Sequence, residues 1–192
     1  MANGQFTEFL KKKKARETPN RTIDWEKRRD IWLDKVKSLM LEINNWLLPY
    51  QDQGLLHTQN SPHSIYEEVM GKWGRYEATR MTITIGLDTV SLTPVGMVIL
   101  GGLGRMDLEG PLGKIKMVLS DTDQKPSFHV VRITSTYPGE NTPQTPDNEG
   151  LSIENRMTSA NWYFVPPDER QKTMLRVTAD TFTEQLQSLV RP

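Results

Sequence analysis

The stretch RMTITIGLDTVSLT, residues 80–93, has a two-residue period that decides the fold. Its apolar side chains alternate with threonine and serine, which is the pattern of a strand buried on one face. The interruption Gly86-Leu87-Asp88 suits a hairpin turn, so the segments on either side are expected to pair antiparallel. This stretch predicts two neighbouring strands of a sheet whose apolar face is covered.

The same alternation continues toward the C-terminus. Further strands are predicted at 105–108, 114–119, 128–134, 162–165 and 173–177, with turns at Pro94-Val95-Gly96 and at residues 109–113. Residues 137–150 contain three prolines, two glycines and almost no apolar side chain, so we expect a mobile loop there. Strands that follow one another with short turns predict a meander.

Two helices are expected to flank this sheet. Upstream, apolar side chains recur at helical spacing and form one broad stripe: Trp25, Trp32, Val36, Leu39, Met40, Ile43, Leu47 and Tyr50. Thr22 or Asp24 can cap the start of this helix, and Pro49 is expected to end it. Downstream, Thr181-Phe182-Thr183-Glu184 has the pattern of a capping box, followed by a short helix with one apolar face.

These elements predict an α+β fold, in which a long N-terminal amphipathic helix and a short C-terminal helix pack on an antiparallel meander sheet or partly open barrel. A pleckstrin-like barrel with a C-terminal capping helix has a similar layout and is the alternative. We expect a basic leader over residues 1–21 and a single domain over 22–192. Residues 56–63 are interpreted as a loop.

Composition narrows the classes of function. The chain has no cysteine, and its 24 basic and 24 acidic residues cancel. The first 37 residues contain eleven basic and six acidic side chains, so the remainder is acidic. No apolar run approaches a membrane span, and we predict a cytoplasmic protein without membrane contact. No motif for catalysis, metal or cofactor occurs, so we expect no enzyme activity, no cofactor and no small-molecule substrate.

Protein binding is the function that these features favour. The segment Gly71–Tyr76 is expected to be a flexible turn. It places aromatic rings among cations, which is the composition of an interaction hot spot: Lys72, Trp73, Arg75 and Tyr76. Arg105 and Asp107 lie two residues apart in a predicted strand and would add to a polar binding face. We therefore predict a non-catalytic accessory subunit of a larger bacterial-type complex, which binds another subunit or a second copy of itself.

Three other interpretations stay open. The leader offers a run of cations for phosphate contacts, which would suit a nucleic-acid-binding accessory protein: Lys11, Lys12, Lys13, Lys14 and Arg16. An enzyme with an unfamiliar site would draw on His57, His63, Arg105 and Asp107. The run Gly101–Asp107 suggests a phosphate cradle, but a glycine kink in the sheet explains it better because no helix is predicted to follow.

Overall fold

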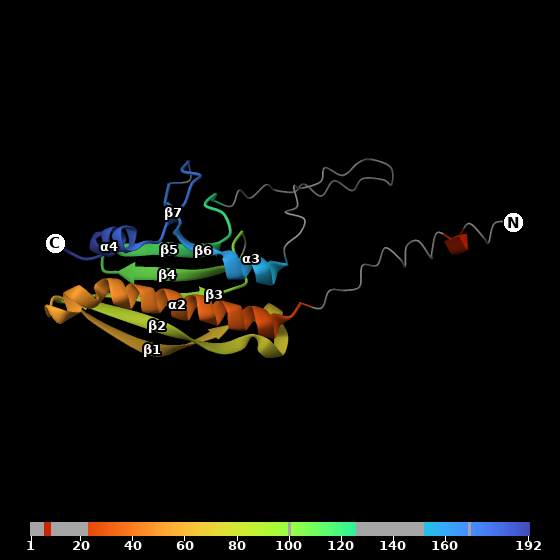
Figure 1. Ribbon diagram of the computed structural model, residues 1–192, viewed down its shortest axis with the longest axis horizontal. Helices are drawn as coiled ribbons and strands as arrows, with labels where there is room; N and C mark the ends of the chain where they lie inside the picture. The colour runs from red at the N-terminus through yellow and green to blue at the C-terminus, as the bar shows by residue number, and fades with distance from the viewer. Residues whose placement is uncertain (1–5, 9–22, 100, 126–151, 169) are drawn as a thin grey trace.

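The computed structural model describes residues 6–8, 23–99, 101–125, 152–168 and 170–192 (Figure 1). Seven strands form one antiparallel sheet, and each strand pairs with the next one along the chain. The strands are β1 His57–Tyr66, β2 Arg75–Ile85, β3 Asp88–Gly96, β4 Gly104–Gly110, β5 Gly113–Ser120, β6 Asn161–Phe164 and β7 Leu175–Arg176. The helices are α2 Trp25–Asp52, the 3₁₀ helix η1 Glu68–Trp73, α3 Ile153–Ser159 and α4 Ala179–Ser188.

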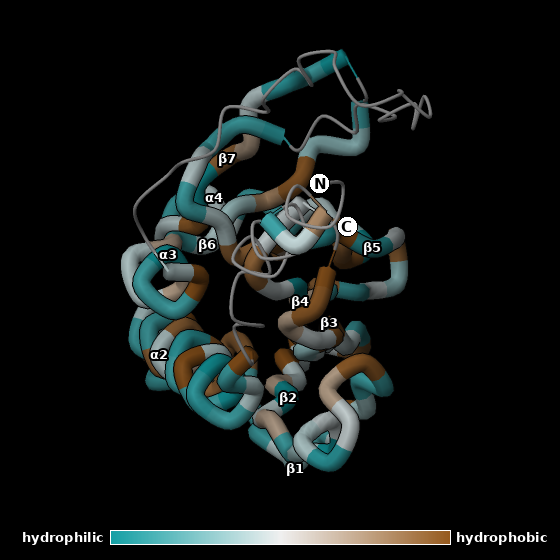
Figure 2. Tube along the Cα trace, turned by 90° about the vertical axis from the view of Figure 1, so that its right-hand side faces the viewer, coloured by the Kyte–Doolittle hydropathy of each residue, from teal (hydrophilic) through white to brown (hydrophobic). Residues whose placement is uncertain are grey.

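The predicted α+β fold is confirmed, with the long helix α2 and the short helix α4 on a meander sheet. The sheet is open, because β1 and β7 end the strand order and do not pair with each other. The barrel alternative is therefore wrong. Figure 2, which looks along the strands, shows α2 and α3 on the same side of the sheet.

The core lies between this helical layer and the inner face of the sheet. The alternating residues of β2 to β5 supply eight fully buried side chains: Met81, Ile83, Val90, Leu92, Met106, Leu108, Met117 and Leu119. From the helices, Trp32 and Phe182 are also fully buried. Trp46 of α2 packs on Phe182 of α4, with ring centroids 6.1 Å apart, so both helices share the core.

The turns of the sheet follow the sequence pattern in part. Gly86 and Leu87 join β2 to β3, and Gly86 supplies the positive φ of 57° that a two-residue hairpin requires. Residues 94–96 were predicted to form a turn, but they continue β3. The register of β3 against β4 shifts between Pro94 and Gly96, so a bulge accommodates this segment within the ladder.

Helix α2 begins where the sequence indicates, since the Asp24 side chain accepts a hydrogen bond from Lys27 N at 3.0 Å. The prediction that Pro49 ends the helix is wrong, because α2 continues to Asp52. Proline fixes its own φ at a helical value and loses only one hydrogen bond. Across the described residues, no helix combines the length and the apolar composition of a membrane span.

Besides η1, two elements were not predicted. Residues 57–66, interpreted as a loop up to His63, form the edge strand β1, whose side chains are mostly exposed. Helix α3 is short, and only Met157 is buried. Two arginine–carboxylate pairs hold α3 in place: Arg28 Nε lies 2.6 Å from Glu154 Oε1, and Arg156 Nε lies 2.6 Å from Asp121 Oδ2.

The Arg28–Glu154 pair joins α2 to α3 in a largely buried place. Burial alone would raise the pKa of Glu154, but the hydrogen bond from Arg28 and weaker local hydrogen bonds lower it to about 2. The hydrogen bond from Arg156 likewise lowers the pKa of Asp121. Both carboxylates therefore stay charged in the folded protein far below neutral pH.

Helix α4 begins three residues before the predicted start. The N-cap is Thr178, which exchanges hydrogen bonds with Thr181 in a capping box. After the helix, Asp88 of β3 accepts hydrogen bonds from Arg191 N at 2.8 Å and Arg191 Nε at 3.0 Å. The chain end that follows α4 is thereby fastened to the β2–β3 hairpin.

Several predictions fall outside the described residues: the loop at 137–150, the strand at 128–134 and nearly all of the leader. The predicted strand at 173–177 is reduced to the two residues of β7.

Candidate functional site

The segment Gly71–Tyr76 is not the predicted flexible turn. Its first half belongs to η1, and Arg75 and Tyr76 open β2. Trp73 is partly buried and takes two cations on its ring, with Arg29 of α2 at 5.4 Å and Lys72 at 4.8 Å from the centroid. Trp73 therefore attaches η1 to α2 by cation–π contacts.

Tyr76 is the predicted partner-binding residue that the structure corrects. Only 7% of its surface is exposed, because alternation along β2 turns it into the core. Its hydroxyl donates a hydrogen bond to Glu67 Oε2. Burial and this hydrogen bond raise the pKa of Tyr76, so the hydroxyl keeps its proton. The Tyr76 side chain thus lies in the core, and its hydroxyl positions Glu67.

Glu67 holds together the end of the molecule where η1 lies. Its Oε1 accepts a hydrogen bond from Val98 N at 2.6 Å, which ties the segment after β3 to η1. At Gly96 a Cβ atom would lie 2.7 Å from Glu67 Oε1, so this glycine permits the close approach. The β1–η1 junction and the end of β3 thus form one surface.

Exposed apolar side chains occur in both segments that Glu67 joins. Tyr66 is 64% exposed and Val69 is 62% exposed, on either side of Glu67 in sequence, and Val95 and Val98 follow at 41% and 43%. We call Tyr66, Val69, Trp73, Val95 and Val98 the η1 patch. Exposed apolar groups that cluster in this way are typical of interaction surfaces, whereas single ones are not.

Cations border the η1 patch. The Arg75 guanidinium lies over the Tyr66 ring at 5.4 Å, and Lys72 covers Trp73. Within the described part of the chain, neither cation forms an ion pair with a carboxylate. The patch therefore combines apolar side chains with cations whose charge is not neutralised by a neighbour.

Arg105 pairs with Gly96, next to Val95 of the patch, but its charge is taken up by Asp107. Both charged residues lie on the outer face of β4, where Arg105 Nε and Nη2 donate to Asp107 at 2.7 and 2.9 Å. Lys114 Nζ joins them, 3.6 Å from Asp107 and 2.8 Å from Glu109. Asp107 is only 8% exposed. These charges satisfy one another, which is the behaviour of a structural surface network.

The glycine run before β4 serves packing. At Gly104 a Cβ atom would lie 2.2 Å from Cζ3 of Trp32, so the strand passes directly against this buried ring. The run leads into β4 and not into a helix, so it lacks the amide-presenting helix start of a phosphate cradle. Close approach of the backbone to Trp32 is the reason for the glycine here.

The residues proposed for an unfamiliar enzyme site do not meet. His57 and His63 lie on β1 and are six residues apart, roughly 20 Å along the strand. Arg105 and Asp107 lie on β4, with β2 and β3 in between. In the described ranges, no three potential ligands are close enough to hold a metal ion. The predicted nucleic-acid-binding cations Lys11, Lys12, Lys13, Lys14 and Arg16 lie outside those ranges.

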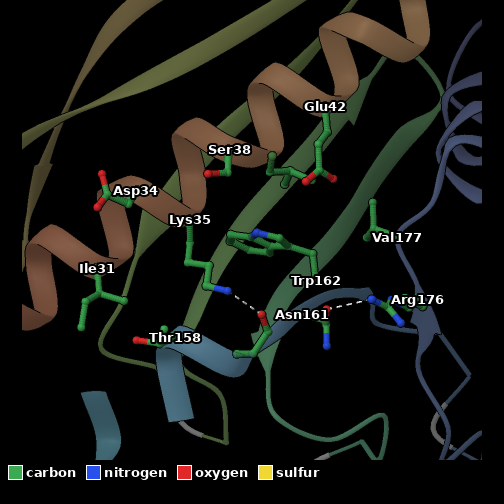
Figure 3. Close-up of a pocket in the computed structure, with 12 residues that line it drawn as sticks. Ile31, Asp34, Lys35, Ser38, Glu42, Thr158, Asn161, Trp162, Arg176 and Val177 are labelled. Atoms are coloured by element: carbon green, nitrogen blue, oxygen red, sulfur yellow. Dashed lines mark hydrogen bonds between the residues drawn. The ribbon is translucent and has the colours of Figure 1, made fainter. Parts of the chain in front are cut away.

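A cleft between α2 and β6 has no counterpart in the sequence predictions. It has a volume of about 460 Å³, and Trp162 is one of its lining residues (Figure 3). Lys35, Asp34 and Glu42 line the α2 side, while Asn161 and Arg176 line the opposite side. Residues more than 120 positions apart thus meet, which no local pattern in the sequence indicates.

Comparison of the chain with family models, with curated proteins and with solved structures finds no match. The geometry described above is therefore the basis for the functional proposals.

Proposed function

We propose that this protein is a non-catalytic interaction module, a subunit of a larger assembly, and that it binds another protein through the η1 patch. The observation that supports the proposal is that both segments joined by Glu67 carry exposed apolar side chains. Tyr66 and Val69 project from one segment and Val95 and Val98 from another, and Glu67 joins the two segments. A patch assembled from two fastened segments is prepared for binding without rearrangement.

The border of the patch defines the chemistry of the partner. Lys72 and Arg75 lie over aromatic rings, which leaves their donor groups free for carboxylates of an incoming surface. We therefore propose a partner with an apolar centre and acidic residues around it. The absence of cysteine supports a cytoplasmic setting, where disulfides are rare.

Val69→Asp tests the proposal, because it places a charge in the patch without touching the core. Leu87→Asp is the matched control, since Leu87 is 100% exposed in the β2–β3 turn at the far end of β2 from η1. Tagged full-length variants are purified from the native host, and their folding is checked by thermal unfolding.

We expect a stoichiometric partner to co-purify with the wild type and with Leu87→Asp, and to be lost with Val69→Asp. The affinity, measured with the purified partner, should fall by about 2 kcal/mol, as for a hot-spot residue. Equal retention of the partner by both variants would place the interface elsewhere on the molecule.

A further inference from the structure

The α2–β6 cleft has the size of a small-molecule site. Ligand pockets measure roughly 300–1,000 Å³, and this cleft of about 460 Å³ lies within that range. Apolar side chains supply part of its wall, among them Ile31, Leu39 and Val177. The cleft and the η1 patch have no lining residue in common, so a ligand here would be independent of the proposed protein partner.

Two cations converge on the floor of the cleft. Lys35 Nζ donates to Ala160 O at 2.9 Å, and Arg176 Nη2 donates to Asn161 Oδ1 at 2.9 Å. Their acceptors belong to adjacent residues, and Figure 3 shows the two positive groups on either side of Asn161, Lys35 coming from α2 and Arg176 from β7. Each hydrogen bond uses one donor, and an ammonium or guanidinium group has several.

Neither cation belongs to an ion pair within the described residues. Burial lowers the pKa of Lys35, and the nearby Glu42 opposes this effect. An anion placed between Lys35 and Arg176 would stabilise both. Carboxylate oxygens match the donors of arginine especially well.

The rim carries the opposite charge. Asp34 and Glu42 lie on α2 above the floor, eight residues or about 12 Å apart along the helix. Between the cations and these carboxylates lies the indole of Trp162, which is 8% exposed and whose Nε1 has no hydrogen-bond partner among the described residues. The cleft thus presents cations below, carboxylates above and an aromatic surface between them.

We propose that the α2–β6 cleft binds a small zwitterion, with its carboxylate between Lys35 and Arg176 and its ammonium group against Asp34 or Glu42. The class includes free amino acids and short amino carboxylates. Two separated charges of opposite sign on the ligand would match those of the cleft, whereas a purely anionic or cationic molecule would meet repulsion at one side.

Calorimetric titration of the purified full-length chain tests this with γ-aminobutyrate, and with butyrate and butylamine as single-charge controls. The indole N–H signal of Trp162, assigned through Trp162→Phe, reports binding at the site by NMR. We expect γ-aminobutyrate to bind about tenfold more tightly than either control, and Arg176→Gln and Lys35→Gln each to weaken it about tenfold.

Lys37→Gln is the matched control, because Lys37 is an exposed lysine of the same helix outside this cleft. Its affinity should stay within about twofold of the wild type. No saturable binding of γ-aminobutyrate, equally tight binding of butylamine, or equal effects of Lys35→Gln and Lys37→Gln would overturn the proposal. Because no partner is present in this titration, its outcome is separate from that of the η1 patch.

Discussion

The two faces of the central sheet are built from the same four strands but differ in polarity and in burial. The inner face of β2 to β5 is a layer of fully buried aliphatic and methionine side chains beneath α2 and α4. The outer face carries Thr82, Ser91, Thr93 and the network around Asp107. The alternation of side chains thus makes the inner face the stabilising core and the outer face a polar surface whose charges pair with one another. The η1 patch differs from both faces, because its apolar side chains are exposed.

The largest effect is expected when a residue of the inner face is compared with its neighbour on the outer face of β3. Leu92→Ala removes a fully buried side chain, whereas Thr93→Ala truncates a polar side chain on the outer face. We expect Leu92→Ala to lower the free energy of unfolding by about 3 kcal/mol and Thr93→Ala by less than about 0.5 kcal/mol. Urea denaturation measures both. Similar losses for the two variants would show that the outer face is also covered.

Gly104 tests how closely the sheet packs against helix α2. A methyl group there would lie 2.2 Å from the buried ring of Trp32. We expect Gly104→Ala to cost about 2 kcal/mol through overpacking. Gly113→Ala is the control, since Gly113 has a similar φ, 150° against 159°, and open space around it. Chemical denaturation of both proteins checks this, and equal costs would assign the effect to the backbone alone.

The smallest expected loss of stability concerns the ion pair that joins α3 to α2. Glu154→Gln removes the charge that pairs with Arg28, and we expect a loss of about 1.5 kcal/mol at pH 7, between the values for exposed and buried pairs. The folded pKa of Glu154 is about 2, below the ordinary value of about 4.3. Its contribution is therefore present above pH 4.3 and lost as the pH falls toward 2.

The difference in unfolding free energy between Glu154→Gln and the wild type should accordingly shrink as the pH falls from about 4.3 to 2. Denaturation curves at pH 7, 4 and 3 measure it. A difference that stays constant over this range would mean that the Glu154 charge does not stabilise the fold.

The inner face could be predicted from the sequence because burial leaves a period of two in it. Strand β1 could not, since an edge strand with exposed side chains has no apolar period, and its histidines, asparagine and Pro62 resemble a loop. Helix α3 has one buried residue, Met157, and is held by arginine pairs with partners far away in the chain. Neither element has a local signal strong enough to detect.

The candidate sites, too, could be predicted from the sequence only in part. The composition of the sequence indicated Trp73, which belongs to the η1 patch, and Lys72 and Arg75, which border it. Composition alone could not show that Tyr76 faces the core. The apolar members Val69, Val95 and Val98 carry no distinctive motif. The α2–β6 cleft depends on α2 meeting β6 and β7 in space, so Lys35 and Arg176 become neighbours only through the tertiary fold.

The proline in β1 limits how this sheet can grow. Glu67 N donates to Gly74 O, so hydrogen bonds to the neighbouring strand fall at odd-numbered residues and the even-numbered backbone groups point outward. Pro62 occupies an outward position in the middle of the free edge and has no N–H to offer. A foreign strand added there would lack its central hydrogen bond. The long polar edge is thereby protected against aggregation by strand addition.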